Sequence, residues 1–194
     1  PLAAGSQKKW GSKTEDFWCC HCTLVQANAR YREWIYYGAD DGITVAQYFP
    51  SEAAFCVDGV PVTLEQKPAD LCEDILEIHE ISHMPANRPT WETVHFTVST
   101  ERPVTFALRL RLPRWIQGDP VFRLNGETVS PKIQDGYAVF ERMWENDTLE
   151  AEYPKSVVCV SLPDKPDTVA FVDGPVVLAG LVPEERICFS SRLR

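Results

Sequence analysis

The sequence is punctuated by pairs in which an Asp or Asn residue is followed by Gly. In a two-residue β-hairpin turn both central residues often adopt positive φ, and Asn-Gly and Asp-Gly pairs do so most readily. Short segments in which apolar and polar residues alternate flank these pairs, with the period of a half-buried strand. Most of this chain is therefore restricted to antiparallel β structure with tight turns. The five pairs are Asp41-Gly42, Asp58-Gly59, Asn125-Gly126, Asp135-Gly136 and Asp173-Gly174.

Segments with a period of two recur from residue 43 to residue 181. Many short strands with prolines at their ends are typical of a sandwich of two sheets. We predict a mainly β fold, an antiparallel β-sandwich of jelly-roll type. Residues 66–92 contain an acidic run without a clear period and receive no assignment. The predicted strands are Ile43–Phe49, Ala53–Val57, Val60–Leu64, Thr93–Val98, Thr105–Leu112, Val121–Leu124, Tyr137–Phe140, Thr148–Tyr153, Val157–Ser161, Val169–Val172 and Val176–Leu181.

One helix is expected before the strands, from Thr23 to Tyr37. Thr23 and Gln26 have the spacing of a capping box, in which the two side chains bind backbone N–H groups at the start of a helix. An apolar stripe follows at helical spacing, and Gly38 is a typical stop signal. The stripe consists of Leu24, Ala27, Tyr31 and Trp34.

Charge and composition exclude several classes of partner. The net charge is −9 and no Lys/Arg cluster is present, so we expect no nucleic-acid binding. No apolar run approaches the ~20 residues that a membrane helix needs, so we expect no membrane span. The sequence begins at Pro1 without a Met or a signal-like segment, and we expect it to be part of a longer polypeptide.

The seven cysteines favour a reducing compartment, because they are odd in number and Cys19 and Cys20 are adjacent. We therefore expect a cytoplasmic protein. The scattered cysteines are expected to be buried free thiols, which behave as small apolar side chains. They are Cys56, Cys72, Cys159 and Cys188.

The segment Phe17–Thr23 concentrates three cysteines and one histidine at the start of the predicted helix. Unpaired N–H groups and the positive end of the helix dipole favour thiolate over thiol there. Thiolates serve both as nucleophiles and as zinc ligands. Two other interpretations stay open: buried thiols beside aromatic residues, and a zinc site at Cys19 and Cys22, for which no second ligand pair follows at the usual spacing.

A second motif, His79-Glu80-Ile81-Ser82-His83, matches H-E-x-x-H. On a helix, its two histidines bind zinc and its Glu activates water. Pro85 limits helical continuation, and the residues from Thr93 to Val98 have the pattern of a strand. We therefore favour an acidic, solvent-facing segment and keep the zinc site as the alternative.

Several motifs, in order along the chain, resemble glycoside hydrolase family 127, which includes the β-L-arabinofuranosidases. The vicinal cysteine pair is similar to the Cys-Cys motif of that family, and the later segments resemble its sandwich strands and hairpins. Cys22 departs from the family, which usually has Gly at this place. The matching segments are Trp18–His21, Thr23–Gln26, Ile35–Tyr37, Leu110–Trp115, Leu124–Glu127, Tyr137–Trp144 with Asp147, and Asp173–Gly180.

The resemblance implies a helical (α/α)-barrel catalytic domain followed by β-sandwich domains. Residues 1–38 would then be the end of the barrel, with its last helix, and residues 39–190 a sandwich. Cys19 would be the catalytic nucleophile, and Cys19 and Cys20 would bind zinc. The other zinc ligands, a Glu and a Cys, and the general-acid Glu would lie upstream of Pro1.

The implied activity is that of a bacterial retaining β-L-arabinofuranosidase acting on a carbohydrate substrate. The expected partner of this chain is the rest of the catalytic domain upstream, and a homodimer is compatible with the sequence. The piece alone would be inactive. The rival class is a non-catalytic sandwich used for carbohydrate binding or packing.

Overall fold

The computed structural model describes residues 26–27, 29–69 and 89–178. Residues 26–27 and 29–30 are helical, and the 3-10 turn η1 (Tyr31–Trp34) follows them. All other regular elements in this part of the chain are strands. They are β1 (Tyr36–Ala39), β2 (Gly42–Val45), β3 (Ser51–Val57), β4 (Val60–Pro68), β5 (Trp91–Thr100), β6 (Val104–Arg111), β7 (Val121–Leu124), β8 (Glu127–Val129), β9 (Lys132–Gln134), β10 (Tyr137–Trp144), β11 (Asp147–Pro154), β12 (Val157–Leu162), β13 (Lys165–Asp173) and β14 (Val176–Val177).

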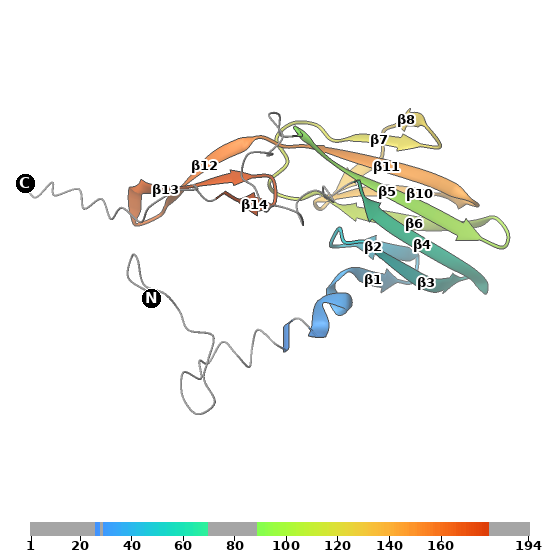
Figure 1. Cartoon of the computed structure of the whole chain (residues 1–194). Helices are drawn as coiled ribbons and strands as arrows, with labels where there is room; N and C mark the ends of the chain where they lie inside the picture. The colour runs from blue at the N-terminus through green and yellow to red at the C-terminus, as the bar shows by residue number, and fades with distance from the viewer. Residues whose placement is uncertain (1–25, 28, 70–88, 179–194) are drawn as a thin grey trace, which may run out of the picture.

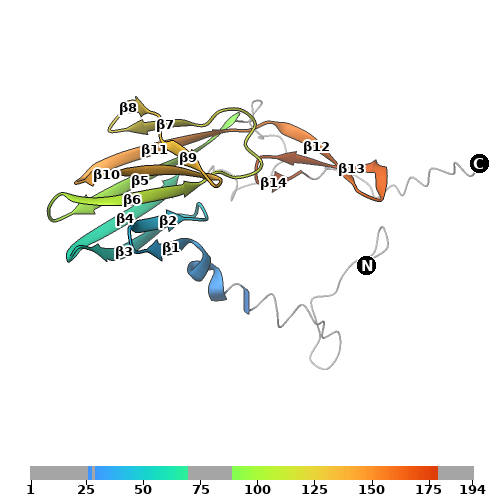
Figure 2. The same cartoon turned by 180° about the vertical axis from the view of Figure 1, so that it is seen from behind.

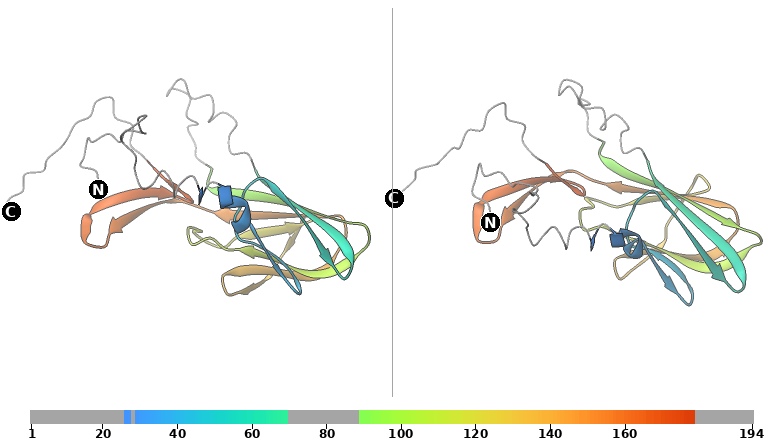
Figure 3. Two further views of the ribbon diagram at one scale, coloured as in Figure 1. Left: turned by 90° about the horizontal axis from the view of Figure 1, so that it is seen from below. Right: turned by 60° about the horizontal axis from the view of Figure 1, so that its bottom comes forward.

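The strands form three sheets, two of which lie face to face as a sandwich (Figures 1 and 2). The five-stranded sheet has the order β1-β2-β6-β10-β9, and the six-stranded sheet has the order β3-β4-β5-β11-β7-β8. The third sheet, β12-β13-β14, projects from one end of the sandwich (Figure 3). The prediction of a mainly β, antiparallel sandwich is confirmed.

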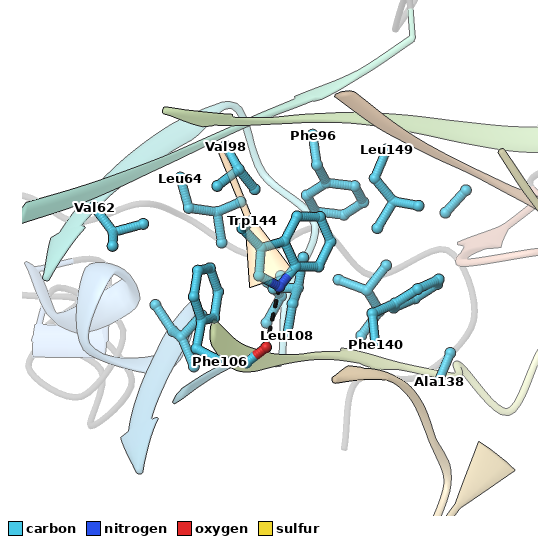
Figure 4. Close-up of a cluster of buried hydrophobic side chains, with 14 of the residues drawn as sticks. Val62, Leu64, Phe96, Val98, Phe106, Leu108, Ala138, Phe140, Trp144 and Leu149 are labelled. Atoms are coloured by element: carbon cyan, nitrogen blue, oxygen red, sulfur yellow. Dashed lines mark hydrogen bonds between the residues drawn. The ribbon is translucent and has the colours of Figure 1, made fainter. Parts of the chain in front are cut away.

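The core of the sandwich is filled by the inward-facing side chains of both large sheets (Figure 4). Trp144 is fully buried at its centre, where its indole stacks on Phe106 with 5.6 Å between ring centroids. The Trp144 Nε1–H donates to the Phe106 carbonyl at 3.0 Å, so the one polar atom of this ring is paired. Phe96, Leu64 and Leu149 from the six-stranded sheet complete the layer above it.

The five Asx-Gly pairs all lie at hairpins of the structure. At three of them both residues have positive φ, as a two-residue turn of this kind requires. Asp58, Asn125 and Asp135 have φ between 49° and 51°. Strands β8 and β9 were not predicted, because three residues are too few to show a period of two, and β1 lies at the end of the predicted helix.

One pairing departs from the antiparallel prediction, because β2 and β6 run parallel. The chain leaves the five-stranded sheet after β2, forms β3, β4 and β5 in the opposite sheet, and then returns as β6. A crossover of this length removes the restriction that a hairpin imposes, so β6 can lie parallel to β2.

The predicted helix from Thr23 to Tyr37 is too long at its C-terminal end. Helical geometry stops at Trp34, and Tyr36 and Tyr37 pair with β2 as strand β1. Ile35, at the junction, is buried, and its carbonyl accepts a hydrogen bond from the Ala46 N–H at 2.8 Å. Pairing with β2 satisfies the backbone groups of residues 36–39, so the helix does not continue through them. The predicted helix start, residues 23–25, lies outside the described residues.

The prediction of buried cysteines is wrong for Cys56 and Cys159, which are both exposed free thiols. Cys56 lies on the outward face of β3, an edge strand of the six-stranded sheet. Cys159 lies in the β12-β13-β14 sheet, whose residues are mostly exposed. Alternation along a strand indicates which residues share a face, but it does not indicate whether another layer covers that face. Cys72 and Cys188 lie outside the described residues.

Candidate functional site

The predicted site residues lie outside the described part of the chain. Cys19 and Cys20 precede its first residue, and the motif His79–His83 falls within residues 70–88. The described residues contain no group of three or more His, Cys, Asp or Glu side chains that could hold a metal ion. Within those same residues, no helix has both the length and the apolar character needed to cross a membrane. What the structure does show is how the sandwich holds the segment that follows the cysteines.

The chain enters the sandwich through a small polar cluster beside Ile35. The hydroxyl groups of Tyr36 and Ser51 lie 3.0 Å apart, and the Gln66 Nε2 donates to Ser51 Oγ at 3.2 Å and to the Gln47 carbonyl at 3.1 Å. Gln66 is completely buried, although its residue type is usually exposed. Burial raises the pKa of Tyr36, so its hydroxyl stays protonated as a donor. This cluster fixes the position at which the segment carrying Cys19 and Cys20 joins the sandwich.

The chain leaves the sandwich at the same end. The Tyr48 hydroxyl donates to the Arg111 carbonyl at 2.5 Å and lies 2.7 Å from the Tyr153 hydroxyl, which donates to it. The two tyrosine rings stack at 5.3 Å, and Trp115 meets Tyr153 edge-on at 6.2 Å. Burial raises the pKa of Tyr48 and of Tyr153, so both remain neutral. Tyr153 is near the end of β11, and Tyr48 follows β2. This pair therefore connects the segment that leaves the sandwich with the segment that enters it.

Two of the family-like motifs contact each other directly. The Asn125 Nδ2 donates to Asp147 Oδ1 at 2.7 Å, and Asn125 Oδ1 accepts from the Thr148 N–H at 2.8 Å. The other Asp147 oxygen accepts from the Glu145 N–H at 3.0 Å. Burial of Asp147 raises its pKa. The hydrogen bonds from Glu145 and Asn125 and the charge of Arg142 together lower the pKa by more, so the net shift is downward. Asn125 and Asp147 therefore join two hairpins and have a structural role.

Charged side chains cross the outward face of the six-stranded sheet. Arg123 binds Glu150 at 2.6 Å and Glu152 at 2.9 Å, and His95 Nδ1 lies 3.4 Å from the second Glu150 oxygen. A shallow hollow of about 230 Å³ lies beside them, and it is open to solvent. A glycosidase needs two carboxyl groups on either side of one bond. Here both carboxylates pair with one arginine on an open face, which indicates cross-strand pairing and not a catalytic pair.

The sequence pattern did not predict these polar anchors. Tyr48, Gln66 and Tyr153 occupy inward positions where an alternating pattern predicts only apolar packing. Their partners come from distant strands or from backbone carbonyls, which no local pattern reveals. The signal available was the presence of Asn125 and Asp147 in two family-like motifs, which do meet in the structure.

Residues 42–155 match the family model described as "Beta-L-arabinofuranosidase, GH127 middle domain". The described strands β2 to β11 lie within this match. The chain is therefore related to the glycoside hydrolases. It belongs to glycoside hydrolase family 127, as its motifs suggested.

Solved structures agree with this assignment. A GH127 β-L-arabinofuranosidase from Geobacillus stearothermophilus T6 is 27% identical, with a TM-score of 0.67 over 91% of this chain and 25% of that chain. A GH127 β-arabinofuranosidase at 20% identity has a TM-score of 0.63 over 82% of this chain and 25% of that one, and shows the same fold. The chain thus spans about a quarter of the length of these structures. No curated protein sequence matches it.

Proposed function

We propose that the chain is part of a retaining β-L-arabinofuranosidase in which Cys19 is the nucleophile. The observation that carries this proposal is the family match over residues 42–155, which begins soon after the Cys19-Cys20 pair. The β-L-arabinofuranosidase from Geobacillus stearothermophilus T6 supports the substrate class, because its likeness covers 91% of this chain.

The proposed reaction is a double displacement. The Cys19 thiolate attacks the anomeric carbon, the glycosidic C–O bond breaks, and the leaving oxygen takes a proton from a glutamic acid expected upstream of Pro1. The same carboxylate then removes a proton from water. This water attacks the anomeric carbon, breaks the C–S bond and releases the Cys19 thiolate. Two inversions at one carbon retain its configuration.

The donor chemistry of Cys19 and Cys20 fits zinc, because two thiolates are ligands that this metal prefers. They supply two of the four ligands of a tetrahedral site, and we propose that a Glu and a Cys upstream of Pro1 supply the others. Zinc, when bound, keeps a coordinated thiol deprotonated. Cys20 would then orient the pair, while Cys19 carries the nucleophilic sulfur.

The sandwich has a supporting role in this proposal. It holds the chain at Ile35 and Tyr36, on the C-terminal side of the cysteine pair, by the backbone and side-chain hydrogen bonds described above. Residues 1–38 would belong to the catalytic domain and residues 39–190 to the sandwich. A thiol nucleophile must remain reduced, which is consistent with a cytoplasmic location.

The test compares Cys19→Ser with Cys56→Ser in the native polypeptide, taken from its own start codon to its own stop codon. The substrate is an aryl β-L-arabinofuranoside. Removal of a nucleophile costs at least about 10³-fold in kcat, so Cys19→Ser should be inactive while its folding is unchanged. Cys56 is an exposed thiol on the outward face of the sandwich, and its replacement should leave the activity unchanged.

Full activity of the Cys19→Ser variant would refute the nucleophile assignment. Loss of both activity and bound zinc in His79→Ala, with Cys19→Ser unaffected, would favour the alternative zinc site at His79–His83. A native polypeptide that binds arabinose-containing oligosaccharides but hydrolyses none would favour the non-catalytic sandwich.

A further inference from the structure

The β12-β13-β14 sheet exposes apolar side chains on both of its faces. Among the described residues, the hydrophobic core contains no side chain from this sheet. The sheet projects from the sandwich in every view (Figures 1 to 3). Its large exposed apolar residues are Val157, Val160, Leu162, Val169, Phe171, Val176 and Val177, with exposed fractions from 42% to 67%.

The strand register divides these residues between two faces. Cys159 lies opposite Phe171, so these two share one face with Val157 and Val176. Val160 lies opposite Ala170, and Val172 lies opposite Val177, on the other face. A sheet with one solvated face has alternating polar residues, whereas strands covered on both faces have continuous apolar runs. The runs 157–160 and 169–172 are of the second kind.

The base of this sheet is fixed to the sandwich. Lys155, which precedes β12, binds Glu92 at 2.9 Å, and its N–H donates to the Thr90 carbonyl at 2.8 Å. A Cβ placed on Gly174 would lie 2.9 Å from the Lys155 side chain and 3.6 Å from the Trp115 ring, so the β13–β14 turn packs closely here. The rest of the sheet extends beyond these contacts. A three-stranded sheet needs a packed layer to be stable.

We infer that the two faces of the β12-β13-β14 sheet are a docking surface for the remainder of the hydrolase polypeptide. This inference rests on the proposed function. In the matched β-L-arabinofuranosidase the alignment covers 25% of the chain, so most of that polypeptide is available to cover such a sheet. A second copy of this chain fits less well, because a two-fold dimer buries one patch on each copy and leaves the opposite face in water.

Two exposed thiols report on this surface within one molecule. Cys159 lies on one face of the β12-β13-β14 sheet, and Cys56 lies on the outward face of β3 in the sandwich. The rate of maleimide labelling of each thiol is measured by mass spectrometry, in the 194-residue chain and in the native polypeptide. In the native polypeptide Cys159 should be labelled at least about tenfold more slowly relative to Cys56 than in the 194-residue chain, because its face is covered.

Two variants of similar exposure sharpen the test. Val176 shares the face of Cys159 and is 52% exposed in β14, and Ile133 is 56% exposed in β9. In the native polypeptide Val176→Lys should restore fast labelling of Cys159, because a buried lysine would oppose docking of this face. Ile133→Lys should leave the Cys159 rate unchanged. The Cys56 rate, which should not change in either variant, is the internal reference for the reagent, and thermal unfolding of each variant shows that the sandwich is still folded.

An unchanged ratio of the Cys159 and Cys56 rates in the native polypeptide would overturn the inference. Protection of Cys159 that falls on dilution of the native polypeptide would also overturn it, because a second copy would then be the occupant. Both outcomes are independent of the arabinofuranosidase assay. A protected Cys159 in an inactive polypeptide would refute the proposed function alone, and an unprotected Cys159 in an active one would refute the docking alone.

Discussion

At the scale of single residues, the polar side chains that the structure buries have a stabilising role. Asp147 is the clearest case, because it is nearly enclosed and is held by the side chain of Asn125 and the backbone N–H of Glu145. These contacts join the β7–β8 hairpin to the β10–β11 hairpin. Two segments that resemble family motifs in the sequence are therefore one structural unit.

Asp147→Asn should lower the free energy of unfolding by about 1–2 kcal/mol at pH 7. Both Asp147 oxygens accept hydrogen bonds, and the amide N–H₂ that replaces one of them would face an N–H donor. The Asp147 pKa is lowered in the folded chain, so its contribution is present above the unfolded pKa of about 4 and is lost as the pH falls through the folded pKa. The difference from the wild type should therefore shrink below about pH 4. Urea denaturation of both chains at pH 7 and pH 3 measures it.

Asp119→Asn is the matched control, because Asp119 is exposed in a loop. Its stability should stay within about 0.5 kcal/mol of the wild type at both pH values. Equal effects of the two substitutions would show that Asp147 has no special role.

The exposure of Cys56 and Cys159 changes how the reactivity of Cys19 should be tested. Order of labelling at neutral pH is not informative, since exposed thiols react readily. At pH 6 an ordinary thiol is only about 0.3% ionised, whereas a thiolate nucleophile stays ionised. Iodoacetamide at pH 6 should therefore label Cys19 in the zinc-depleted native polypeptide well before Cys56, because the expected helix N-terminus favours the Cys19 thiolate even without zinc. Equal rates at the two cysteines would contradict an activated Cys19.

At the scale of elements, the β2–β6 pair depends on a glycine. Gly42 has φ +154°, and a Cβ placed there would lie 2.0 Å from the Ala107 carbonyl oxygen of β6. The Ala107 N–H donates to the Asp41 carbonyl at 2.8 Å, and Arg109 of β6 pairs with the Asp41 carboxylate. The Arg109 hydrogen bond lowers the pKa of Asp41. Close backbone approach is what brings β6 against the β1–β2 hairpin.

Gly42→Ala should therefore destabilise the chain by about 2–4 kcal/mol, because the clash is with backbone that cannot rotate away. Gly38→Ala is the matched substitution in the same hairpin, where the added Cβ meets nothing within 4 Å. It should change the stability by less than about 1 kcal/mol. Thermal unfolding of the two variants distinguishes them, and similar melting temperatures would contradict the role of Gly42.

The elements show which parts of the fold a sequence can predict. Most strand positions and all five Asx-Gly hairpins were predicted, because alternation and turn chemistry are local properties. The parallel β2–β6 pair was not, because it depends on a partner far along the chain. The early end of the helix was not either, because residues 36–39 pair with β2, the strand that follows them. The cysteine site was predicted from a motif, and it remains a prediction because it lies outside the described residues.

At the scale of the whole molecule, the described sandwich supplies support and no complete catalytic site. If the acid and two zinc ligands belong to a separate part of the polypeptide, the 194-residue chain alone should hydrolyse no aryl β-L-arabinofuranoside above background. It should also bind zinc weakly, since Cys19 and Cys20 fill half of a tetrahedral site. Assays with added zinc measure both properties.

The native polypeptide is the positive control for this prediction. Chelation should remove its zinc and its activity together, and added zinc should restore both. Turnover by the 194-residue chain at a rate similar to that of the native polypeptide would show that its own residues make a complete site.

The parallel pairing of β2 and β6 also affects the order of folding during synthesis. Arg111 and Ala46, which share a hydrogen bond at this junction, are 65 residues apart in the sequence. The β1–β2 hairpin therefore leaves the ribosome well before β6, the next strand of its sheet, with the apolar Ile43 and Val45 still uncovered. Closing so long a loop is slow compared with forming a hairpin. Between synthesis of β2 and synthesis of β6, one edge of the β1–β2 hairpin therefore has no partner strand, and an unpaired edge of this kind favours aggregation.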